Sequence, residues 1–411
     1  MHGRRRWLEM TAAFAGAAAA SRIGAQPYPG VPHEYARVDP QHTMRFPRDF
    51  GAHPGFRTEW WYVTGWLDGN RGFQVTFFRA RTAHPSSNPS RFAPTQLLFA
   101  QAALMLPENG HALHGQRAAR IGAPGAAFSE EDANVAIGNW TFSRGADDRY
   151  HTVIRDSSFS FDLVLSPPGE PGQEINRPWL QGEQGFSRKG PRPEQASHYY
   201  SRPQLRVSGR VNDKPVQGTA WFDHEWSSTY LDPLASGWDW TGLNLDDGSA
   251  LMAFRIRRRG DERNGDGSAG TSGERSTQKS TEKSSEKNAE KSTEKITEKI
   301  AEGTVTPEPL WSYCALRHRD GRIEPLDPVR FEVLRRWQSP RTTANYPVSV
   351  RLVMPGRTLT LEPLFDDQEI DARQSTGTIY WEGAVRVIDG NGLGAGRGYL
   401  ELTGYSTALK I

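Results

Sequence analysis

Two stretches of the sequence decide the fold: Trp61-Tyr62-Val63-Thr64-Gly65 in the first half of the chain and Trp238-Asp239-Trp240-Thr241-Gly242 in the second. Each begins an apolar strand pattern that passes through an Asp-Gly turn into a second apolar strand. That second strand carries Arg79 in the first unit and Arg255 in the other. Self-similarity in a fixed order indicates that one fold has been duplicated. Chance similarity between two β-hairpins is the alternative.

The length and composition of the chain agree with a duplication. At 411 residues it exceeds the size at which one hydrophobic core stops growing, so we expect two domains, at residues 41–231 and 232–411. The 18 Phe, 13 Trp, 12 Tyr, 41 Gly and 28 Pro are typical of short strands joined by tight turns. We therefore predict an all-β protein of two tandem antiparallel barrels, each of about eight strands and wide enough for one small ligand.

Alternating apolar and aromatic runs, separated by Gly, Pro, Asn and Asp, predict the positions of the strands. The clearest are residues 59–67, 72–81, 97–104, 140–143, 159–165 and 204–211. Between the first two runs, Asp68-Gly69-Asn70 suits a hairpin turn, because Gly and Asn tolerate positive φ.

The first residues resemble an export signal. Residues 1–25 combine three consecutive arginines, beginning at Arg4, with a short apolar stretch and a small residue, Ala25, at the expected cleavage position. The run from Arg4 to Leu8 also resembles a twin-arginine motif, and a general secretory signal is the alternative. We therefore expect a periplasmic or secreted protein.

Residues 259–308 read as a low-complexity insertion within the second domain. A four-residue repeat of the type Ser-Thr-Glu-Lys runs from Ser276 to Gly303 with almost no apolar residues. Such a segment cannot bury enough surface to offset its ordering entropy. We expect a disordered or partly helical loop between strands at 251–257 and 310–317, and a docking tail is the less favoured interpretation.

Charge and motif content exclude several classes of function. The 50 Lys and Arg against 48 Asp and Glu give no electrostatic argument for binding nucleic acid or an anionic membrane. The sequence has no G-x-S-x-G elbow, no paired-histidine zinc motif and no glycine-rich phosphate loop. The single cysteine, Cys314, favours a buried structural role over a catalytic thiol. We expect no metal and no cofactor.

The densest group of chemically active side chains is Trp221-Phe222-Asp223-His224-Glu225-Trp226. Side chains of a strand alternate between its faces, so one face should carry Phe222, His224 and Trp226. The other should carry Trp221, Asp223 and Glu225. His224 is either an internal acid–base group or a structural residue bonded to a backbone carbonyl, and both readings stay open.

Further candidates for ligand contact are polar and aromatic residues of neighbouring runs. They are Glu59, Trp61, Tyr62, His198, Tyr199, Trp238 and Trp240. Arg79 and Arg255 stand at equivalent ends of the two repeats, where we expect each to pack across a tryptophan and plug the closed end of a barrel by a cation–π contact.

Seven motifs, in order along nearly the whole mature chain, carry a resemblance to a known family. They are Glu59-Trp60-Trp61-Tyr62, Ser197-His198-Tyr199-Tyr200-Ser201, Gly218-Thr219-Ala220-Trp221-Phe222-Asp223-His224-Glu225-Trp226, Gly237-Trp238-Asp239-Trp240, Asp367-Gln368-Glu369, Tyr380-Trp381-Glu382-Gly383-Ala384-Val385 and Gly398-Tyr399-Leu400-Glu401-Leu402-Thr403-Gly404-Tyr405. With them the chain resembles the carotenoid 1,2-hydratase-like, or AttH-type, family of secreted lipocalin-like proteins. The resemblance implies two lipocalin-like (calycin) domains in tandem.

For the hydratase branch of that family, the resemblance implies acid-catalysed addition of water to an isoprenoid double bond without an organic cofactor. His224 and Trp226 match the His-x-Trp pair of this branch. Its aromatic-x-Asp pair on the following strand is missing, since the corresponding stretch reads Ala253-Phe254-Arg255-Ile256. Asp223, Glu225 or Asp239 would have to replace that carboxylate.

Three functions follow as hypotheses. The favoured one is an exported protein that holds an apolar lipid or isoprenoid inside a barrel, with a partner in the envelope or a transport system left open. The alternative is a hydro-lyase of the hydratase type. A hydrolase that uses Asp223 and Glu225 is the weakest, because neighbours on one strand face lie too close for inverting chemistry. The sequence leaves the ligand, the oligomeric state and the barrel that holds the pocket undetermined.

Overall fold

The computed structural model describes residues 35–84, 93–260 and 308–409, and this part of the chain is almost entirely β-structure. The predicted signal at residues 1–25 and nearly all of the low-complexity insertion lie outside the described residues. Within them, no helix has the length and apolar character that crossing a membrane requires. Three short 3-10 helices occur, η1 (Arg48–Phe50), η2 (Pro107–Asn109) and η3 (Glu174–Asn176).

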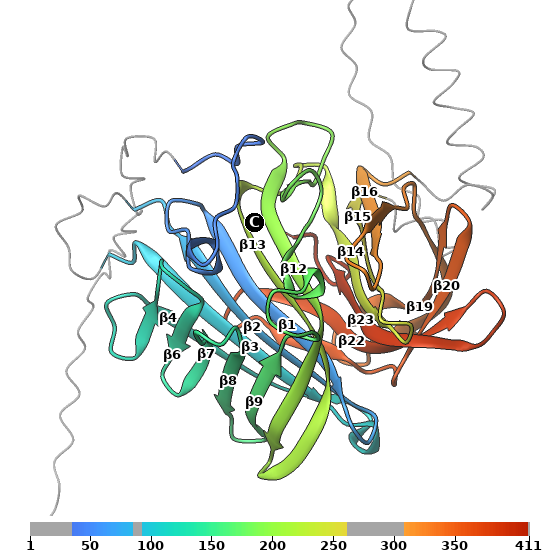
Figure 1. The fold of residues 1–411 in the computed structure, drawn as a ribbon, viewed down its shortest axis with the longest axis horizontal. Helices are drawn as coiled ribbons and strands as arrows, with labels where there is room; N and C mark the ends of the chain where they lie inside the picture. Colours follow the sequence, from blue (N-terminus) through green and yellow to red (C-terminus); the bar gives the residue numbers. More distant parts are fainter. Residues whose placement is uncertain (1–34, 85–92, 261–307, 410–411) are drawn as a thin grey trace, which may run out of the picture.

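The first sheet has 13 strands and curls into a nearly closed barrel, which we call the first barrel (Figure 1). In spatial order its strands are β4 (Ala112–Arg120), β3 (Gln96–Met105), β2 (Arg71–Arg81), β1 (Thr58–Leu67), β13 (Lys214–Thr229), β12 (Ala196–Val211), β9 (Ser160–Ser166), β8 (Tyr150–Arg155), β7 (Trp140–Arg144), β6 (Asn134–Ile137) and β5 (Ala126–Phe128). Two short strands, β10 (Trp179–Leu180) and β11 (Phe186–Arg188), pair with β12.

The second sheet has 10 strands and forms a half-barrel, which we call the second barrel. In spatial order its strands are β17 (Ile323–Pro325), β16 (Trp311–Arg317), β15 (Ala250–Arg258), β14 (Ala235–Leu245), β23 (Gly394–Thr403), β22 (Thr378–Asp389), β20 (Arg357–Pro363), β19 (Asn345–Met354) and β18 (Arg330–Gln338), and β21 (Glu369–Ala372) pairs with β22. The prediction of two barrel-like all-β domains is confirmed, although the second barrel is open.

The strands stand where the alternation pattern predicts them. The six predicted runs form β1, β2, β3, β7, β9 and β12. The turn between β1 and β2 places Gly69 at φ 70° and Asn70 at φ 55°, as the turn residues require. The strands on either side of the insertion, β15 and β16, pair antiparallel.

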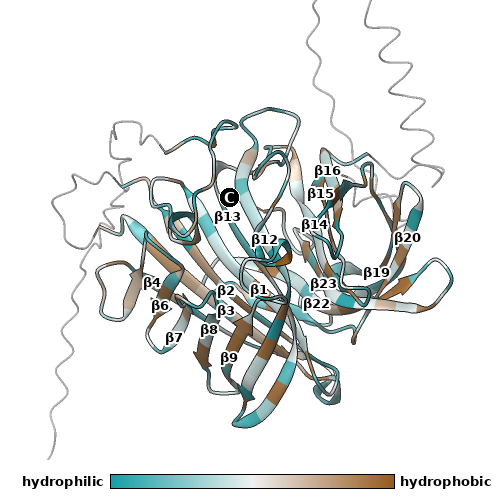
Figure 2. Ribbon diagram, in the orientation of Figure 1, coloured by the Kyte–Doolittle hydropathy of each residue, from teal (hydrophilic) through white to brown (hydrophobic). Residues whose placement is uncertain are grey.

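Three apolar clusters pack the molecule. The interior of the first barrel is filled by residues that include Trp61, Phe73, Trp140, Phe161 and Phe222. The interior of the second barrel is filled by residues that include Leu243, Leu251, Tyr346, Trp381 and Leu402. A third cluster draws on both barrels and includes Trp66, Tyr199, Trp221, Met252 and Tyr399. Hydrophobic and hydrophilic residues alternate along the long hairpin of β12 and β13 (Figure 2), as expected for strands whose two faces have different surroundings.

The two arginines of the repeat do not plug the barrels as expected. Arg79 lies opposite Glu59 and Arg255 lies opposite Asp239, so the two stand at different offsets from Thr64 and Thr241. Arg79 donates from Nε to the Glu59 carboxylate at 2.7 Å, and Arg255 donates from Nε to Asp239 at 2.7 Å. The ring beneath the Arg255 guanidinium is Phe331 and not a tryptophan. The expectation was wrong because a buried guanidinium is held by a carboxylate more strongly than by a ring.

Candidate functional site

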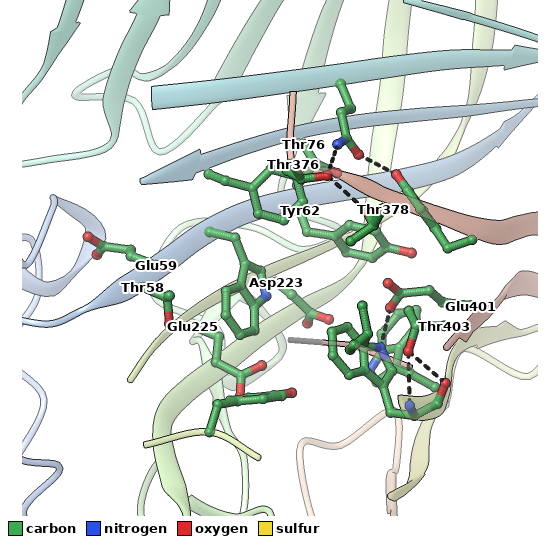
Figure 3. Close-up of a pocket in the computed structure, with 18 of the residues that line it drawn as sticks. Thr58, Glu59, Tyr62, Thr76, Asp223, Glu225, Thr376, Thr378, Glu401 and Thr403 are labelled. Atoms are coloured by element: carbon green, nitrogen blue, oxygen red, sulfur yellow. Dashed lines mark hydrogen bonds between the residues drawn. The ribbon is translucent and has the colours of Figure 1, made fainter. Parts of the chain in front are cut away.

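A pocket of about 290 Å³ lies between the two barrels and is lined by the outer faces of both (Figure 3). Its walls are formed mainly by aromatic rings, namely Trp60, Tyr62, Phe78, Phe99, Tyr199, Tyr230, Trp238, Trp240, Phe254 and Tyr380. Five acidic residues also line it, Glu59, Asp223, Glu225, Glu382 and Glu401. We expected a ligand cavity inside a barrel. This pocket lies instead between the barrels, and the interiors of both barrels contain packed apolar clusters.

Strand alternation on β13 decides which predicted residues face the pocket. Asp223 and Glu225 line it, whereas His224 points into the first barrel, where its ring stacks on Trp61 with centroids 4.8 Å apart. The same alternation on β12 places Tyr199, opposite Glu225, at the pocket. The two faces predicted for residues 221–226 are therefore observed, and the pocket belongs to the carboxylate face.

Asp223 is held by three donors. The Tyr199 hydroxyl donates to Oδ2 at 2.7 Å, and the Ser201 hydroxyl and the Trp221 indole donate to Oδ1 at 2.5 and 2.7 Å. Burial raises the pKa of Asp223 to about 7 in spite of these hydrogen bonds. The group is thus fixed in one orientation and changes its charge near neutral pH.

Glu225, the next acid on this face, pairs with a buried lysine. Lys189 Nζ lies 2.9 Å from Glu225 Oε1, and Ser197 donates to the same oxygen. Burial raises the pKa of Glu225 and lowers the pKa of Lys189, although each opposes the other's shift by its charge. Both shifts reduce the free-energy difference between the ion pair and the neutral pair.

The second barrel contributes two acids that lie opposite each other on β22 and β23, Glu382 and Glu401. Burial raises the pKa of Glu401 to about 7, and the pKa of Glu382 lies well above its usual range because of burial and the nearby Glu401. Glu401 accepts one hydrogen bond, from the Trp238 indole at 3.0 Å, and Glu382 accepts one from Tyr62. Figure 3 shows the carboxyl groups of Asp223, Glu225 and Glu401 gathered in the pocket while Glu59 points away from them.

Inside the first barrel, a separate polar cluster surrounds the Glu59 carboxylate. His53 Nδ1 lies 2.7 Å and His224 Nε2 lies 2.9 Å from Glu59 Oε1, and Arg79 binds Oε2. Burial lowers the pKa of His224, so its neutral ring donates to Glu59 and accepts at Nδ1 from the Tyr200 hydroxyl at 3.0 Å. Burial also opposes charging of His53, but Glu59 outweighs it and raises the pKa of His53.

The side chains of His53, Glu59 and His224 could offer three ligand atoms within 4.8 Å of one another to a metal. The Glu59 oxygens are already satisfied by the Arg79 guanidinium, two imidazole groups and the His53 backbone N–H. The geometry is that of a hydrogen-bonded charge network, in which Arg79 supplies the positive charge.

The remaining predicted site residues lie inside the first barrel, inside the second barrel or at the pocket between the barrels. Trp226 lies inside the first barrel and stacks on His53 with centroids 3.7 Å apart. His198 is buried against Phe56 and Trp226, and burial lowers its pKa to about 3. Asp239 lies within the second barrel, bound by Arg255 and Arg257. Tyr62, Tyr199, Trp238 and Trp240 line the pocket between the barrels.

Sequence reasoning missed Lys189, Glu382 and Glu401 as pocket residues. Glu382 stands between Trp381 and Gly383, and Glu401 between Leu400 and Leu402. Burying a charged residue inside an apolar strand without a partner costs free energy, so the position of each glutamate in the sequence could have indicated a functional site. Lys189 follows a three-residue strand, β11, and its sequence surroundings carry no comparable signal.

These features define a class of protein: a tandem of two lipocalin-like barrels with an aromatic, carboxyl-bearing pocket between them. The chain belongs to the AttH-like family, which matches at residues 37–304 and 303–405. The family resemblance drawn from the sequence is thereby confirmed.

Solved structures agree with this assignment. A protein of Nitrosomonas europaea assigned to AttH is 42% identical, covers 90% of this chain and 99% of its own, and superposes with a TM-score of 0.72. Kievitone hydratase from Nectria haematococca is 13% identical, covers 91% of this chain and 96% of its own, and has a TM-score of 0.57, which shows a shared fold. No curated protein matches the chain.

Proposed function

We propose that the protein binds an apolar, isoprenoid-like molecule in the pocket between the barrels and adds water to one of its double bonds by acid catalysis. The observation that carries the proposal is a pair of buried carboxyl groups, Asp223 and Glu401, whose pKa values are about 7 and which meet in one aromatic pocket from different barrels. A carboxyl group with a pKa near 7 can be protonated or ionised at neutral pH, so such a pair can supply both the acid and the base that this chemistry needs.

The roles of the two acids follow from their hydrogen bonds. Glu401 accepts a single hydrogen bond from Trp238, so its protonated form has an oxygen available to donate a proton to the alkene. Asp223 receives three donors, an arrangement that favours its ionised form, so it is suited to orient and deprotonate the attacking water. The rings of Trp240 and Phe254 would stabilise the intermediate cation.

The size of the pocket limits the part of the ligand it can hold. A cavity of about 290 Å³ is at the lower end of the range of about 300–1,000 Å³ for small-molecule sites. It therefore suits one end of a long isoprenoid chain or a whole short one. The fold shared with kievitone hydratase is consistent with this use.

Binding without turnover is the second candidate, since an aromatic pocket between two barrels also suits a carrier of apolar molecules. Export to the periplasm or outside the cell belongs to both proposals and is tested by N-terminal sequencing of the fractionated protein, which should begin after residue 25. A partner in the envelope remains part of the carrier proposal.

The experiment uses the full chain with geraniol, farnesol and lycopene as probes. Quenching of tryptophan fluorescence measures binding, since Trp60, Trp238 and Trp240 line the pocket. Mass spectrometry in ¹⁸O-labelled water measures hydration. We expect Glu401→Gln to abolish hydration and retain binding, with Thr403→Val, a substitution at the pocket on the same strand, as the matched control.

The outcomes separate the candidates. Binding with no hydration of any probe would support the carrier and overturn the hydratase. Loss of hydration in His224→Gln together with unchanged hydration in Glu401→Gln would move the chemistry into the first barrel, as the family resemblance implies. No binding of any probe would overturn both candidates.

A further inference from the structure

Lys189 lines the pocket, and the proposed function gives its amine no role. Its side chain is only 2% exposed, and its Nζ lies among the rings of Phe254, Tyr199 and Tyr230, at 4.2, 4.6 and 5.5 Å from their centroids. Glu225 is the carboxylate that pairs with the Lys189 amine. Because Lys189 also lines the pocket, its amine is within reach of a bound ligand.

We infer that Lys189 forms an imine with an apolar aldehyde or ketone bound in the pocket between the barrels. The inference rests on the proposed function only in using the same pocket. It names a ligand class, isoprenoid-like carbonyl compounds, and assigns a second chemical capability to the site. An amine shielded from water in an apolar pocket is the setting in which lysine acts as a nucleophile.

Glu225 balances the protons of this reaction. The ammonium of Lys189 passes one proton to the Glu225 carboxylate, and the free amine attacks the carbonyl carbon to form the C–N bond. The nitrogen then loses a proton as the oxygen gains one, which gives a carbinolamine. Glu225 returns its proton to the hydroxyl, which leaves as water, and the C=N bond forms. The products are a protonated imine, paired with the Glu225 carboxylate, and one water.

The charges around Lys189 suit this exchange. Burial lowers the pKa of Lys189 and raises the pKa of Glu225, and both shifts reduce the free-energy cost of moving a proton from the ammonium to the carboxylate, which lie 2.9 Å apart. Asp223 is the other carboxyl group close enough to act on the amine, and it favours the charged form of Lys189. The protonated imine would keep a positive charge at the position of the Lys189 ammonium, next to Glu225 and Asp223.

Reductive trapping tests the inference on the full-length protein. The protein is incubated with farnesal and sodium cyanoborohydride at neutral pH, and the modified lysine is identified by peptide mass spectrometry. We expect Lys189 to be labelled at least tenfold faster than Lys214, which is exposed on β13. Formaldehyde, which needs no apolar pocket, should show no such preference.

Variants separate the covalent role from a structural one. Lys189→Arg retains the charge beside Glu225 and should give no trapped product at this position, while Lys214 remains labelled as in the wild type. Glu225→Gln removes the proton acceptor and should slow labelling of Lys189 by at least tenfold. Circular dichroism confirms that each variant is folded.

The outcomes distinguish this inference from the proposed function. Farnesol binding together with labelling confined to exposed lysines would overturn the imine and leave the pocket proposal standing. Preferential labelling of Lys189 without hydration of any alkene would support the imine and count against the hydratase. Unchanged labelling in Glu225→Gln would overturn the proton exchange.

Discussion

Tyr62, on β1 of the first barrel, donates a hydrogen bond from its phenol to the carboxyl group of Glu382, on β22 of the second barrel. Both side chains are buried at the pocket, so this bond both joins the barrels and fixes one of the acids of the site. A further cross-barrel bond lies close by, from the Trp240 indole to the Tyr199 hydroxyl at 3.1 Å. The pocket therefore exists only while the two barrels are held together.

Removing the Tyr62 hydroxyl should weaken the contact between the barrels. Tyr62→Phe leaves the Glu382 carboxyl group without its donor, and we expect a loss of about 1–3 kcal/mol in the free energy of unfolding, measured by urea denaturation. Tyr399→Phe is the matched control, because within the described residues the buried Tyr399 hydroxyl has no hydrogen-bond partner. Equal effects of the two substitutions would show that the Tyr62–Glu382 bond does not stabilise the assembly.

Gly242 lies where β14 approaches the tryptophans of the interface. A methyl group at this position would meet the Trp240 ring at 2.6 Å and the Trp221 ring at 2.8 Å. Gly242→Ala should therefore destabilise the protein by about 1–3 kcal/mol through overpacking and reduce quenching of the pocket tryptophans by farnesol. Gly394→Ala, on β23, is the control, since nothing lies within 4 Å of the added methyl group. A stable Gly242→Ala protein that binds farnesol normally would contradict the packing described.

Arg79 and Glu59 form a fully buried ion pair inside the first barrel. Burial alone would raise the pKa of Glu59, but Arg79 and His53 outweigh it and hold the pKa well below its usual range. Arg79→Met leaves that charge without its main partner and should cost about 3–5 kcal/mol. Arg71→Met removes a solvent-exposed ion pair with Asp68 and should cost less than about 1 kcal/mol. Thermal and urea unfolding of both variants measures the difference in stability. Similar losses in the free energy of unfolding would contradict a buried ion pair between Arg79 and Glu59.

Asp223 and Glu401 should contribute stability that is lost as the pH rises from about 5 to about 8. Asp223 and Glu401 have pKa values of about 7 in the folded protein, above their ordinary values of 3.8 and 4.5. A group with a raised folded pKa contributes its full stability below the unfolded pKa and loses it as the pH rises through the folded pKa. The raised pKa of His53 acts in the same direction, whereas the lowered pKa values of His198 and His224 act in the opposite direction.

Urea unfolding at several pH values tests this dependence. Glu401→Gln removes one of the groups whose contribution is lost at higher pH, so raising the pH should destabilise this variant less than it destabilises the wild type. Thr403→Val, which removes no titrating group, should keep the wild-type slope. A slope that is the same in all three proteins would show that Glu401 does not have the raised pKa.

The sequence predicted the local architecture well because its signals are local. The alternation of apolar and polar residues located β1, β2 and β9, and the positive φ tolerated by Gly69 and Asn70 located the first hairpin turn. Alternation also separated His224 from Asp223 and Glu225 correctly. What it could not give was which face of each strand meets a ligand, since both faces of these strands are apolar and both are buried.

The sequence by itself determined that this chain is an all-β fold with two barrel-like domains, that carboxyl groups stand inside its aromatic strands, and which residues share a strand face. All of these follow from the period of two along a strand. Only the tertiary structure decided that the pocket lies between the barrels, that Glu382 and Glu401 of the second barrel join Asp223 there, and that Lys189 enters it from a loop. The physical reason is that these residues are distant along the chain, and only the packing of one barrel on the other brings their side chains together and removes them from water.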